Sequence, residues 1–323
     1  MRFLWRLLAL GTGILVGLAF AVVLYGWYGP GPAAQSKTFT VEEGSSVAGV
    51  AMQLERAGLI SSARSFKIGA RVMGSGDPVQ AGEFEIPKGA SGAGILELLQ
   101  HGKPVLRLIT VTEGMPSIIV EEKLKTNGFL TGPTPSIAEG SVLPDSYGYE
   151  RDESRAAVVQ RMQAAMTKTI DQLLKKGAGN CPVSSREQIV TLASIVEKET
   201  GKASERGMVA GVYCNRLRIG MKLDADPTVI YPITKGKPLG RRIKRSELNA
   251  ITGYNTYREP GLPMGPIANP GKESLAAVMN PEQTKALYFV ADGTGGHVFA
   301  DTLQQHQSNV KRWYEIRRQR GEM

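Results

Sequence analysis

The N-terminal end of the chain is its most hydrophobic part. Residues 7–28 include no charged side chain, and Arg2 and Arg6 precede them. At 1.5 Å per residue, a helix over this stretch is long enough to span a bilayer once. The positive-inside rule then predicts a cytoplasmic segment 1–6, a transmembrane anchor 7–28 and an exported body.

A cleaved signal peptide is the alternative to a retained anchor. The small residues Ala33 and Ala34 suit a cleavage site, but the apolar stretch is longer than the roughly 7 to 15 residues of a signal-peptide core. We therefore expect the anchor to be retained. Residues 29–36, which follow it, are rich in glycine and proline and predict a linker.

Beyond the linker, a pattern of a short strand, a turn and a helix occurs twice. Segment 41–58 recurs as segment 111–128, each with a Glu-Gly turn followed by apolar residues at helical spacing. Between the copies, residues 81–86 alternate like a strand and residues 93–99 have the apolar spacing of a helix. A small α+β module is therefore predicted over residues 37–105.

This small module resembles LysM-type glycan-binding modules, in which two helices lie between two strands. The resemblance implies that it binds polymers of N-acetylglucosamine. A spacer without glycan affinity is the alternative, and the sequence leaves both open.

The rest of the chain, residues 106–323, predicts a larger α+β domain. A long charged helix is expected from Ser154 to about Lys176. A central helix follows, because residues 184–187 match a capping box and Gly201 stands where a C-terminal cap would end it. Another helix is predicted from Ser204 to Gly220. The predicted fold class is α+β, with a membrane helix, a LysM-like module and this larger domain.

Three polar tracts of the larger domain are expected outside long helices. Residues 224–231 and 254–257 are predicted to form loops or short strands. Residues 261–271 contain too much glycine and proline for regular structure, so they predict a fixed loop.

The composition narrows the possible partners. A formal charge of +9 and a pI near 9.5 suit nucleic acid, an anionic membrane face or an anionic wall polymer. Export of the body argues against nucleic acid, and we expect no such partner. Residues 265–272 look superficially like a phosphate loop, but Pro270 replaces the second glycine and Glu273 stands where Ser or Thr is needed. We reject that interpretation.

Histidine and cysteine are scarce. His101, His297 and His306 are the only histidines, and none forms a helical i, i+4 pair or lies beside a plausible thiol nucleophile in the sequence. No metal or organic cofactor is implied, and acid–base catalysis by carboxylates is the chemistry that remains. Cys181 and Cys214 can pair in an oxidising compartment, but sequence does not determine their separation.

The central helix carries two candidate catalytic carboxylates. Its apolar stripe places Glu197 and Glu199 on opposite edges, so periodicity does not choose between them. Partial burial at such an edge raises a carboxyl pKa and suits a general acid. The alternative is a pair of solvated helix charges, with Glu199 paired to an arginine such as Arg206.

A series of motifs in a characteristic order changes the weight of these alternatives. They occupy residues 193–200, 205–206, 215–217, 226–231, 254–257, 261–263, 266–271 and 288–297. Together they resemble the YceG-like (MltG) family of endolytic murein transglycosylases over nearly the whole chain. The chain departs from common versions of the family at Met264, where a second proline is usual.

The resemblance implies a single-pass inner-membrane enzyme with a periplasmic catalytic domain over residues 106–323. It would cut peptidoglycan strands internally between N-acetylmuramic acid and N-acetylglucosamine and leave 1,6-anhydro-N-acetylmuramic acid ends. The family's catalytic glutamate falls on Glu197. One carboxylate suffices, because the muramoyl C6 hydroxyl is a nucleophile already tethered to the reacting ring. A peptidoglycan synthase is the expected partner, and cutting beside it would set the length of the nascent glycan strands.

The family's other polar motifs suggest a substrate-binding set. Its members are Glu139, Asp226, Thr228, Tyr254, Asn255 and Tyr257. For Asp226, a turn-forming role ahead of Pro227 is an equal alternative. Two other functions stay open: a muramidase that uses Glu197 with a second carboxylate such as Asp226 or Glu139, and a wall-binding scaffold without catalysis.

Overall fold

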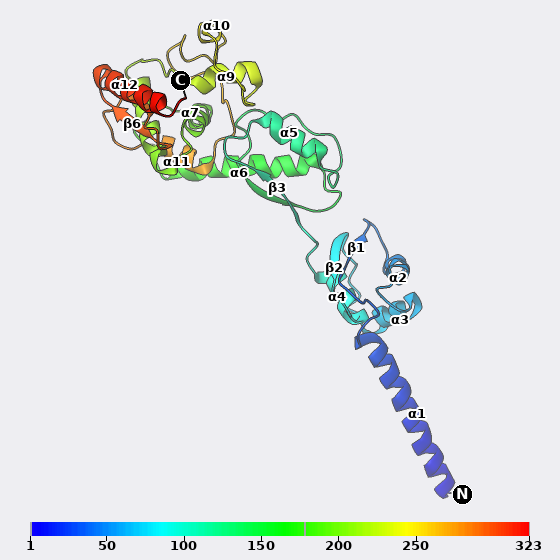
Figure 1. Ribbon diagram of the computed structural model, residues 1–323. Coiled ribbons are helices and arrows are strands. Elements are labelled where there is room, and N and C mark those ends of the chain that lie inside the picture. The colour runs from blue at the N-terminus through cyan, green and yellow to red at the C-terminus, as the bar shows by residue number, and fades with distance from the viewer. Residues whose placement is uncertain (1, 178, 323) are drawn as a thin grey trace. The chain divides into compact units, whose positions relative to one another are not determined.

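The computed structural model describes residues 2–177 and 179–322, and it divides the chain into two compact units, 1–107 and 108–323 (Figure 1). The domain boundary expected at residues 105–106 lies next to this division. Helices and short strands are mixed in both units, which makes the protein α+β.

The first unit consists of a long N-terminal helix and a small folded part. Its elements are α1 (Arg2–Tyr28), β1 (Lys37–Val41), α2 (Val47–Arg56), α3 (Ala63–Met73), β2 (Gly82–Ile86) and α4 (Gly92–His101). Strands β1 and β2 pair antiparallel, with Phe39 opposite Phe84, and both rings are buried. The strand, helix, strand and helix expected in this segment correspond to β1, α2, β2 and α4, whereas α3 was not predicted. The LysM-like character of the segment remains a prediction.

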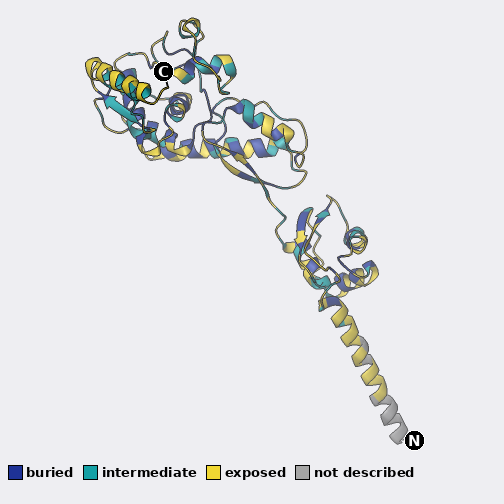
Figure 2. Cartoon of the chain, viewed as in Figure 1, coloured by how far each residue is buried: buried dark blue, intermediate teal, exposed yellow. Residues whose placement is uncertain are grey.

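Helix α1 is long and apolar enough to cross a membrane. Residues 11–28 have a mean hydropathy of 1.6. Its described side chains are almost all exposed (Figure 2), as expected for a helix with no protein around it. Trp27 is the exception, because it is buried within the folded part of the unit.

The second unit contains most of the helices. They are α5 (Ser117–Thr126), α6 (Arg155–Lys175), α7 (Arg186–Glu199), the 3-10 helix η1 (Ala203–Glu205), α8 (Arg206–Arg218), α9 (Asp226–Thr234), α10 (Arg245–Leu248), α11 (Lys272–Met279) and α12 (Leu303–Gln319). The strands are β3 (Arg107–Val111), which begins at the boundary, β4 (Asp145–Tyr149), β5 (Tyr288–Ala291) and β6 (His297–Ala300); β3 pairs with β4 and β5 with β6.

Helix α7 is the centre of this unit. All residues from Ile189 to Val196 are buried, and the helix packs against α8, α9 and α11. Its capping box is formed by Ser185 and Gln188, one residue later than the sequence predicted, because Gln188 reaches back to the backbone at the start of the helix. The helix ends at Glu199, so both candidate glutamates lie in its last turn.

Two sequence expectations change in the structure. Residues 226–231 were expected to form a loop or short strand, but they belong to helix α9, where Pro227 occupies the first turn that tolerates proline. The cysteine pairing that sequence left open is present: Cys181 and Cys214 form a disulfide with their Cα atoms 5.0 Å apart. It joins the segment after α6 to α8, beside α7.

Candidate active site

Glu197 lies where the last turn of α7 meets the end of the Gly- and Pro-rich loop. Its side chain is only 6% exposed. Oε2 accepts a hydrogen bond of 2.8 Å from the Gly271 amide, and Oε1 lies 3.4 Å from Nη2 of Arg206 at the start of α8. Both neighbours are donors, so they stabilise a negative charge on this carboxylate.

A second carboxylate shares the same arginine. Nη2 of Arg206 donates a 2.8 Å hydrogen bond to Glu113, which comes from the turn between β3 and α5. Burial and the charge of nearby Glu197 raise the pKa of Glu113, while Arg206 acts against them. The Glu113 carboxyl group also lies against Gly271, so that a Cβ at this position would displace it.

The loop over residues 261–271 was expected to be fixed, and Asn269 is the residue that holds it. Asn269 is fully buried, and its Nδ2 donates to the Met115 carbonyl at 2.9 Å and to Ser117 Oγ at 3.0 Å. Its Oδ1 accepts from the Val142 amide at 3.2 Å. One side chain thus connects the loop to the β3–α5 turn and to the segment before β4, and thereby positions Gly271 for Glu197.

Glu139 takes part in the same network, behind the loop. Its Oε1 accepts 2.9 Å and 3.1 Å hydrogen bonds from the amide and hydroxyl of Ser117. Burial raises its pKa, although the bonds from Ser117 act in the opposite direction. Glu139 supports the frame of the site, and it does not line the cavity described next.

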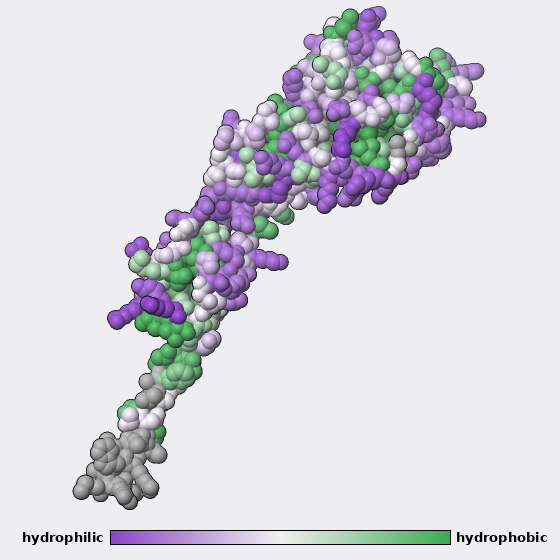
Figure 3. Space-filling view, turned by 180° about the vertical axis from the view of Figure 1, so that it is seen from behind, coloured by the Kyte–Doolittle hydropathy of each residue, from purple (hydrophilic) through white to green (hydrophobic). Residues whose placement is uncertain are grey.

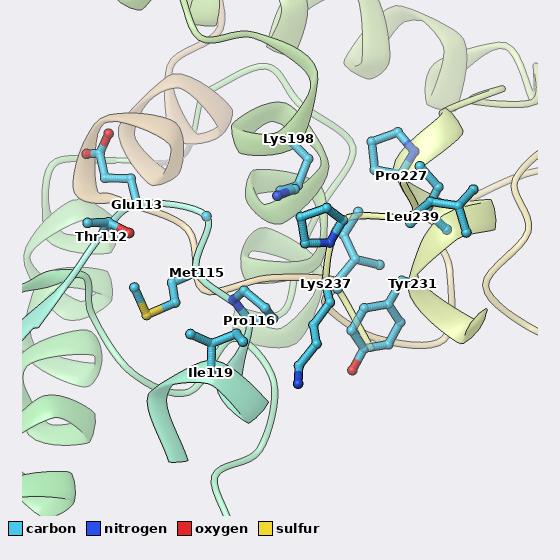
Figure 4. Close-up of a pocket in the computed structure, with 15 residues that line it drawn as sticks. Thr112, Glu113, Met115, Pro116, Ile119, Lys198, Pro227, Tyr231, Lys237 and Leu239 are labelled. Carbon is cyan, nitrogen blue, oxygen red and sulfur yellow. The ribbon is translucent and has the colours of Figure 1, made fainter. Parts of the chain in front are cut away.

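A cavity of about 610 Å³ lies beside Glu113 in the second unit. Figure 4 shows Glu113 near one end of its lining and Tyr231 near the other, with Pro116, Lys198 and Lys237 between them. Volumes of this order are typical of ligand sites. The lining combines apolar surface with two lysines, one acid and one aromatic ring, a mixture suited to an anionic or polar ligand.

Glu199 has a different environment from Glu197, two residues away. Its Oε1 is inaccessible to solvent and has no hydrogen-bond partner among the described residues. Burial and the charge of Asp226 raise the pKa of Glu199 to about 7, against the opposing effects of Tyr213 and Arg216. The pairing with Arg206 considered from the sequence is wrong, because Arg206 contacts Glu197 and Glu113 instead.

Both predicted tyrosines contact residues near the site: Tyr257 contacts Asp226, and Tyr254 contacts a residue of the cavity lining. Tyr257 donates a 2.7 Å hydrogen bond from its hydroxyl to Asp226 Oδ1. Tyr254 packs against Tyr231 with ring centroids 4.9 Å apart, and so supports a residue that lines the cavity. The charge of Asp226 also raises the pKa of Glu199, and Asp226 begins helix α9 ahead of Pro227. A substrate contact by Asp226 stays a prediction.

Thr228 and Asn255, the other two predicted binding residues, are buried. The Thr228 hydroxyl donates to the Ala225 carbonyl at 2.6 Å and lies 2.9 Å from the Thr256 hydroxyl. Asn255 Nδ2 donates to three backbone carbonyls, those of residues 247, 248 and 250. Both side chains therefore hold loops in place and do not line the cavity.

Sequence reasoning missed Glu113, Lys198 and Lys237 as members of the site. Glu113 was treated as part of a repeated turn, because Glu43 has the same place in the first copy. The two copies of the repeated turn differ in their three-dimensional contacts, because Glu113 forms a hydrogen bond with Arg206 and Glu43 does not. The structure describes no group of three or more His, Cys, Asp or Glu residues able to hold a metal ion, within the residues it covers.

These features define an α+β protein whose candidate active site is built from carboxylates that share an arginine beside a cavity. The sequence profile of the YceG-like family matches residues 39–312, and the chain belongs to that family. A solved structure of a YceG-like protein from Listeria monocytogenes is similar, with a TM-score of 0.53 and 26% identity, over 85% of this chain and 98% of that one.

Similar proteins named for an enzymatic activity include two endolytic murein transglycosylases. An endolytic murein transglycosylase of Bacillus subtilis strain 168 is 28% identical, over 93% of this chain and 91% of its own length. One of Streptococcus pneumoniae serotype 2, strain D39, is also 28% identical, over 84% of this chain. The match spans 57% of the length of the pneumococcal protein.

We expect Asn269→Ala to destabilise the second unit. The substitution removes three side-chain hydrogen bonds and leaves the Val142 amide without the partner it has in the structure, at a cost of roughly 3 kcal/mol. Denaturant unfolding of the full-length protein measures this loss. The same change at exposed Asn249 is the control and should cost less than about 0.5 kcal/mol; equal losses would contradict the assigned role of Asn269.

The raised pKa of Glu199 predicts a pH-dependent difference between the wild type and Glu199→Gln. Unfolding lowers this pKa from about 7 to its ordinary value of 4.5, so the folded state binds more protons between these values. Wild-type stability is therefore lost as pH rises through this window. The free energy of unfolding of Glu199→Gln should exceed that of the wild type by almost nothing at about pH 4 and by roughly 3 kcal/mol at about pH 8.

Thermal and denaturant unfolding across this pH range test that prediction. Glu259→Gln, on an exposed loop, serves as the matched control for replacing a glutamate by glutamine. Parallel stability profiles of the wild type and Glu199→Gln would contradict the burial assigned to this carboxyl group.

Proposed function

We propose that this protein is a lytic transglycosylase that cleaves peptidoglycan glycan strands internally, between N-acetylmuramic acid and N-acetylglucosamine, and leaves 1,6-anhydro-N-acetylmuramic acid ends. The family match over residues 39–312 is the observation that carries the proposal. Two relatives named endolytic murein transglycosylase support it. The site adds a chemical basis, because its reactive groups are carboxylates.

Glu197 is the proposed general acid and base. In its protonated form it donates a proton to the glycosidic oxygen as the bond to the anomeric carbon breaks. The resulting carboxylate then accepts the proton of the muramoyl C6 hydroxyl, whose oxygen attacks the anomeric carbon and closes the anhydro ring. The Gly271 amide and Arg206 stabilise the carboxylate between these two steps.

The cavity beside Glu113 is the proposed binding place for part of the glycan strand. Tyr231, supported by Tyr254, offers an aromatic face against which a sugar ring can pack. Lys198 places positive charge where lactyl or peptide carboxylates of the substrate would lie, whereas the Lys237 ammonium is paired with Glu122 at 2.7 Å. Asp226 and Tyr257 are proposed to act indirectly: Tyr257 bonds to Asp226, whose charge acts on the buried carboxyl group of Glu199.

Helix α1 is the proposed single-pass anchor in the inner membrane, with the N-terminus in the cytoplasm and the catalytic unit in the periplasm. Its apolar length supports an anchor, and Arg2 and Arg6 support the orientation. An endolytic cutter held at the membrane meets nascent strands as they are made. We therefore propose that it works beside a peptidoglycan synthase and limits strand length.

A muramidase is the second candidate function, and the position of Glu113 favours it. Glu113 and Glu197 both contact one guanidinium, so two carboxyl groups lie near each other, and Glu113 also lines the cavity. Hydrolysis of a glycosidic bond with two carboxylates uses such a pair. The products differ: hydrolysis leaves a reducing end, whereas the lytic reaction leaves an anhydro end.

Mass spectrometry of the products tests the function. The full-length protein in detergent should release internal fragments with anhydromuramic acid ends from intact glycan strands. Glu197→Gln should lower the rate by several orders of magnitude, because it removes the transferable proton. Glu199→Gln, the same substitution two residues away in the same helix, should lose less.

Three outcomes would change the assignment. Reducing ends would support the muramidase and a catalytic Glu113. Equal losses for Glu197→Gln and Glu199→Gln would mean that the acid is wrongly assigned or that the two act together. Wild-type cellular function of Glu197→Gln, combined with its loss on deleting residues 37–105, would support a wall-binding scaffold without catalysis.

A further inference from the structure

The exposed face of α3 combines basic and apolar residues and has no acidic one. Arg64, Lys67 and Arg71 are exposed, and so are Ile68 at 56% and Val72 at 74%. We call these five residues the α3 face. Basic residues beside exposed apolar ones on a short amphipathic helix are typical of segments that lie on an anionic membrane surface.

The residues around the axis of α3 follow a fixed order from the buried side to the apolar pair and then to the basic residues. At 100° per residue, Phe66 and Ala70 mark the buried side, and Gly69 lies at its edge, against the Trp27 ring. Ile68 and Val72 come next around the helix, and the three basic residues follow. The apolar pair is therefore the part of the α3 face adjacent to the side that contacts α1.

Trp27 packs α3 against the C-terminal end of α1 and so determines which turn of α1 lies beside α3. Its ring lies 5.6 Å from that of Phe66, and a Cβ at Gly69 would overlap the indole. Trp27 is itself buried at 5% exposure, so the end of α1 and α3 belong to one packed core. Figure 3 shows hydrophobic residues continuing from α1 onto the adjoining end of the folded part, with strongly hydrophilic side chains beside them.

The same turn of α1 marks the membrane–water boundary. Tyr25 and Tyr28 are 72% and 59% exposed, and tyrosines at the end of an apolar span sit at the headgroup level. Because Trp27 lies between them, α3 is held at the depth of the headgroups. Long basic side chains at that depth extend towards phosphate while apolar ones reach the acyl boundary.

We propose that the α3 face docks onto anionic phospholipid headgroups of the membrane that α1 spans, with Ile68 and Val72 at the acyl boundary and the three basic residues on lipid phosphates. The inference rests on the proposed role of α1 as an anchor. Such docking converts a single helical tether into a two-point attachment and holds the first unit against the bilayer surface.

Spin labels on the full-length protein in vesicles test the docking. A nitroxide on Val72→Cys should be more accessible to oxygen than to a water-soluble nickel complex in vesicles of phosphatidylcholine and phosphatidylglycerol. Glu43→Cys, on the exposed turn after β1, is the matched control and should show the opposite accessibility. A water-like Val72 label identical to the Glu43 label would overturn the proposal.

A label on Leu18→Cys separates failure of the anchor from failure of the docking. If the Leu18 label lies in the bilayer and the Val72 label lies in water, docking alone is wrong. If the Leu18 label is also in water, the anchor and the docking are both wrong. Neither result bears on the products formed from glycan strands, so the proposed reaction is judged independently.

Charge reversal tests the chemistry of the partner. Arg64→Glu, Lys67→Glu and Arg71→Glu together should lower the docked-to-undocked ratio by on the order of 100-fold, since each basic residue near an anionic surface contributes about a factor of five. All three positions are exposed, so the fold should survive. Vesicles of phosphatidylcholine alone should weaken docking of the wild type, and an unchanged Val72 signal in both experiments would overturn the electrostatic assignment.

Discussion

The contact of one arginine with two glutamates is the constraint on which the candidate site depends. Arg206 is only 13% exposed and reaches Glu197 of α7 and Glu113 of the β3–α5 turn with the same nitrogen. Two carboxylates this close repel each other, and burial adds a desolvation cost to each. The guanidinium offsets both effects, so three segments distant in sequence meet where the buried charges of Glu197 and Arg206 are paired.

The packing around α7 follows from that requirement. The helix is buried from Ile189 to Val196, so its last turn emerges at a defined place, and the disulfide of Cys214 ties neighbouring α8 to the chain before α7. Asn269 then ties the glycine- and proline-rich loop to the β3–α5 turn. A loop without regular structure can therefore deliver the Gly271 amide to Glu197 as reliably as a helix would.

Much of the fold could be predicted from local patterns, and much of the site could not. The strands, helices and glycine turns of the repeated segment follow from apolar spacing, as does the N-terminal apolar helix. Helix α9 was missed, because Thr228, Val229 and Ile230 are β-branched and favour strands, whereas Pro227 in the first turn and burial favour the helix. The pairing of Glu113 with Arg206 has no local signal, since it joins residues far apart along the chain.

Glu197 and Glu199 are two glutamates of one helix that acquire different chemistry from their surroundings. Periodicity placed them on opposite edges of one helix and could not rank them. In the structure, one edge meets a cation and an amide donor, and the other meets a buried region where the negative charge of Asp226 opposes ionisation. The proposed reaction leaves a carboxylate on the acid between its two proton transfers, and hydrogen-bond donors stabilise that carboxylate. Glu197 has two such donors, the Gly271 amide and Arg206, whereas Glu199 has Oε1 inaccessible to solvent and without a partner among the described residues.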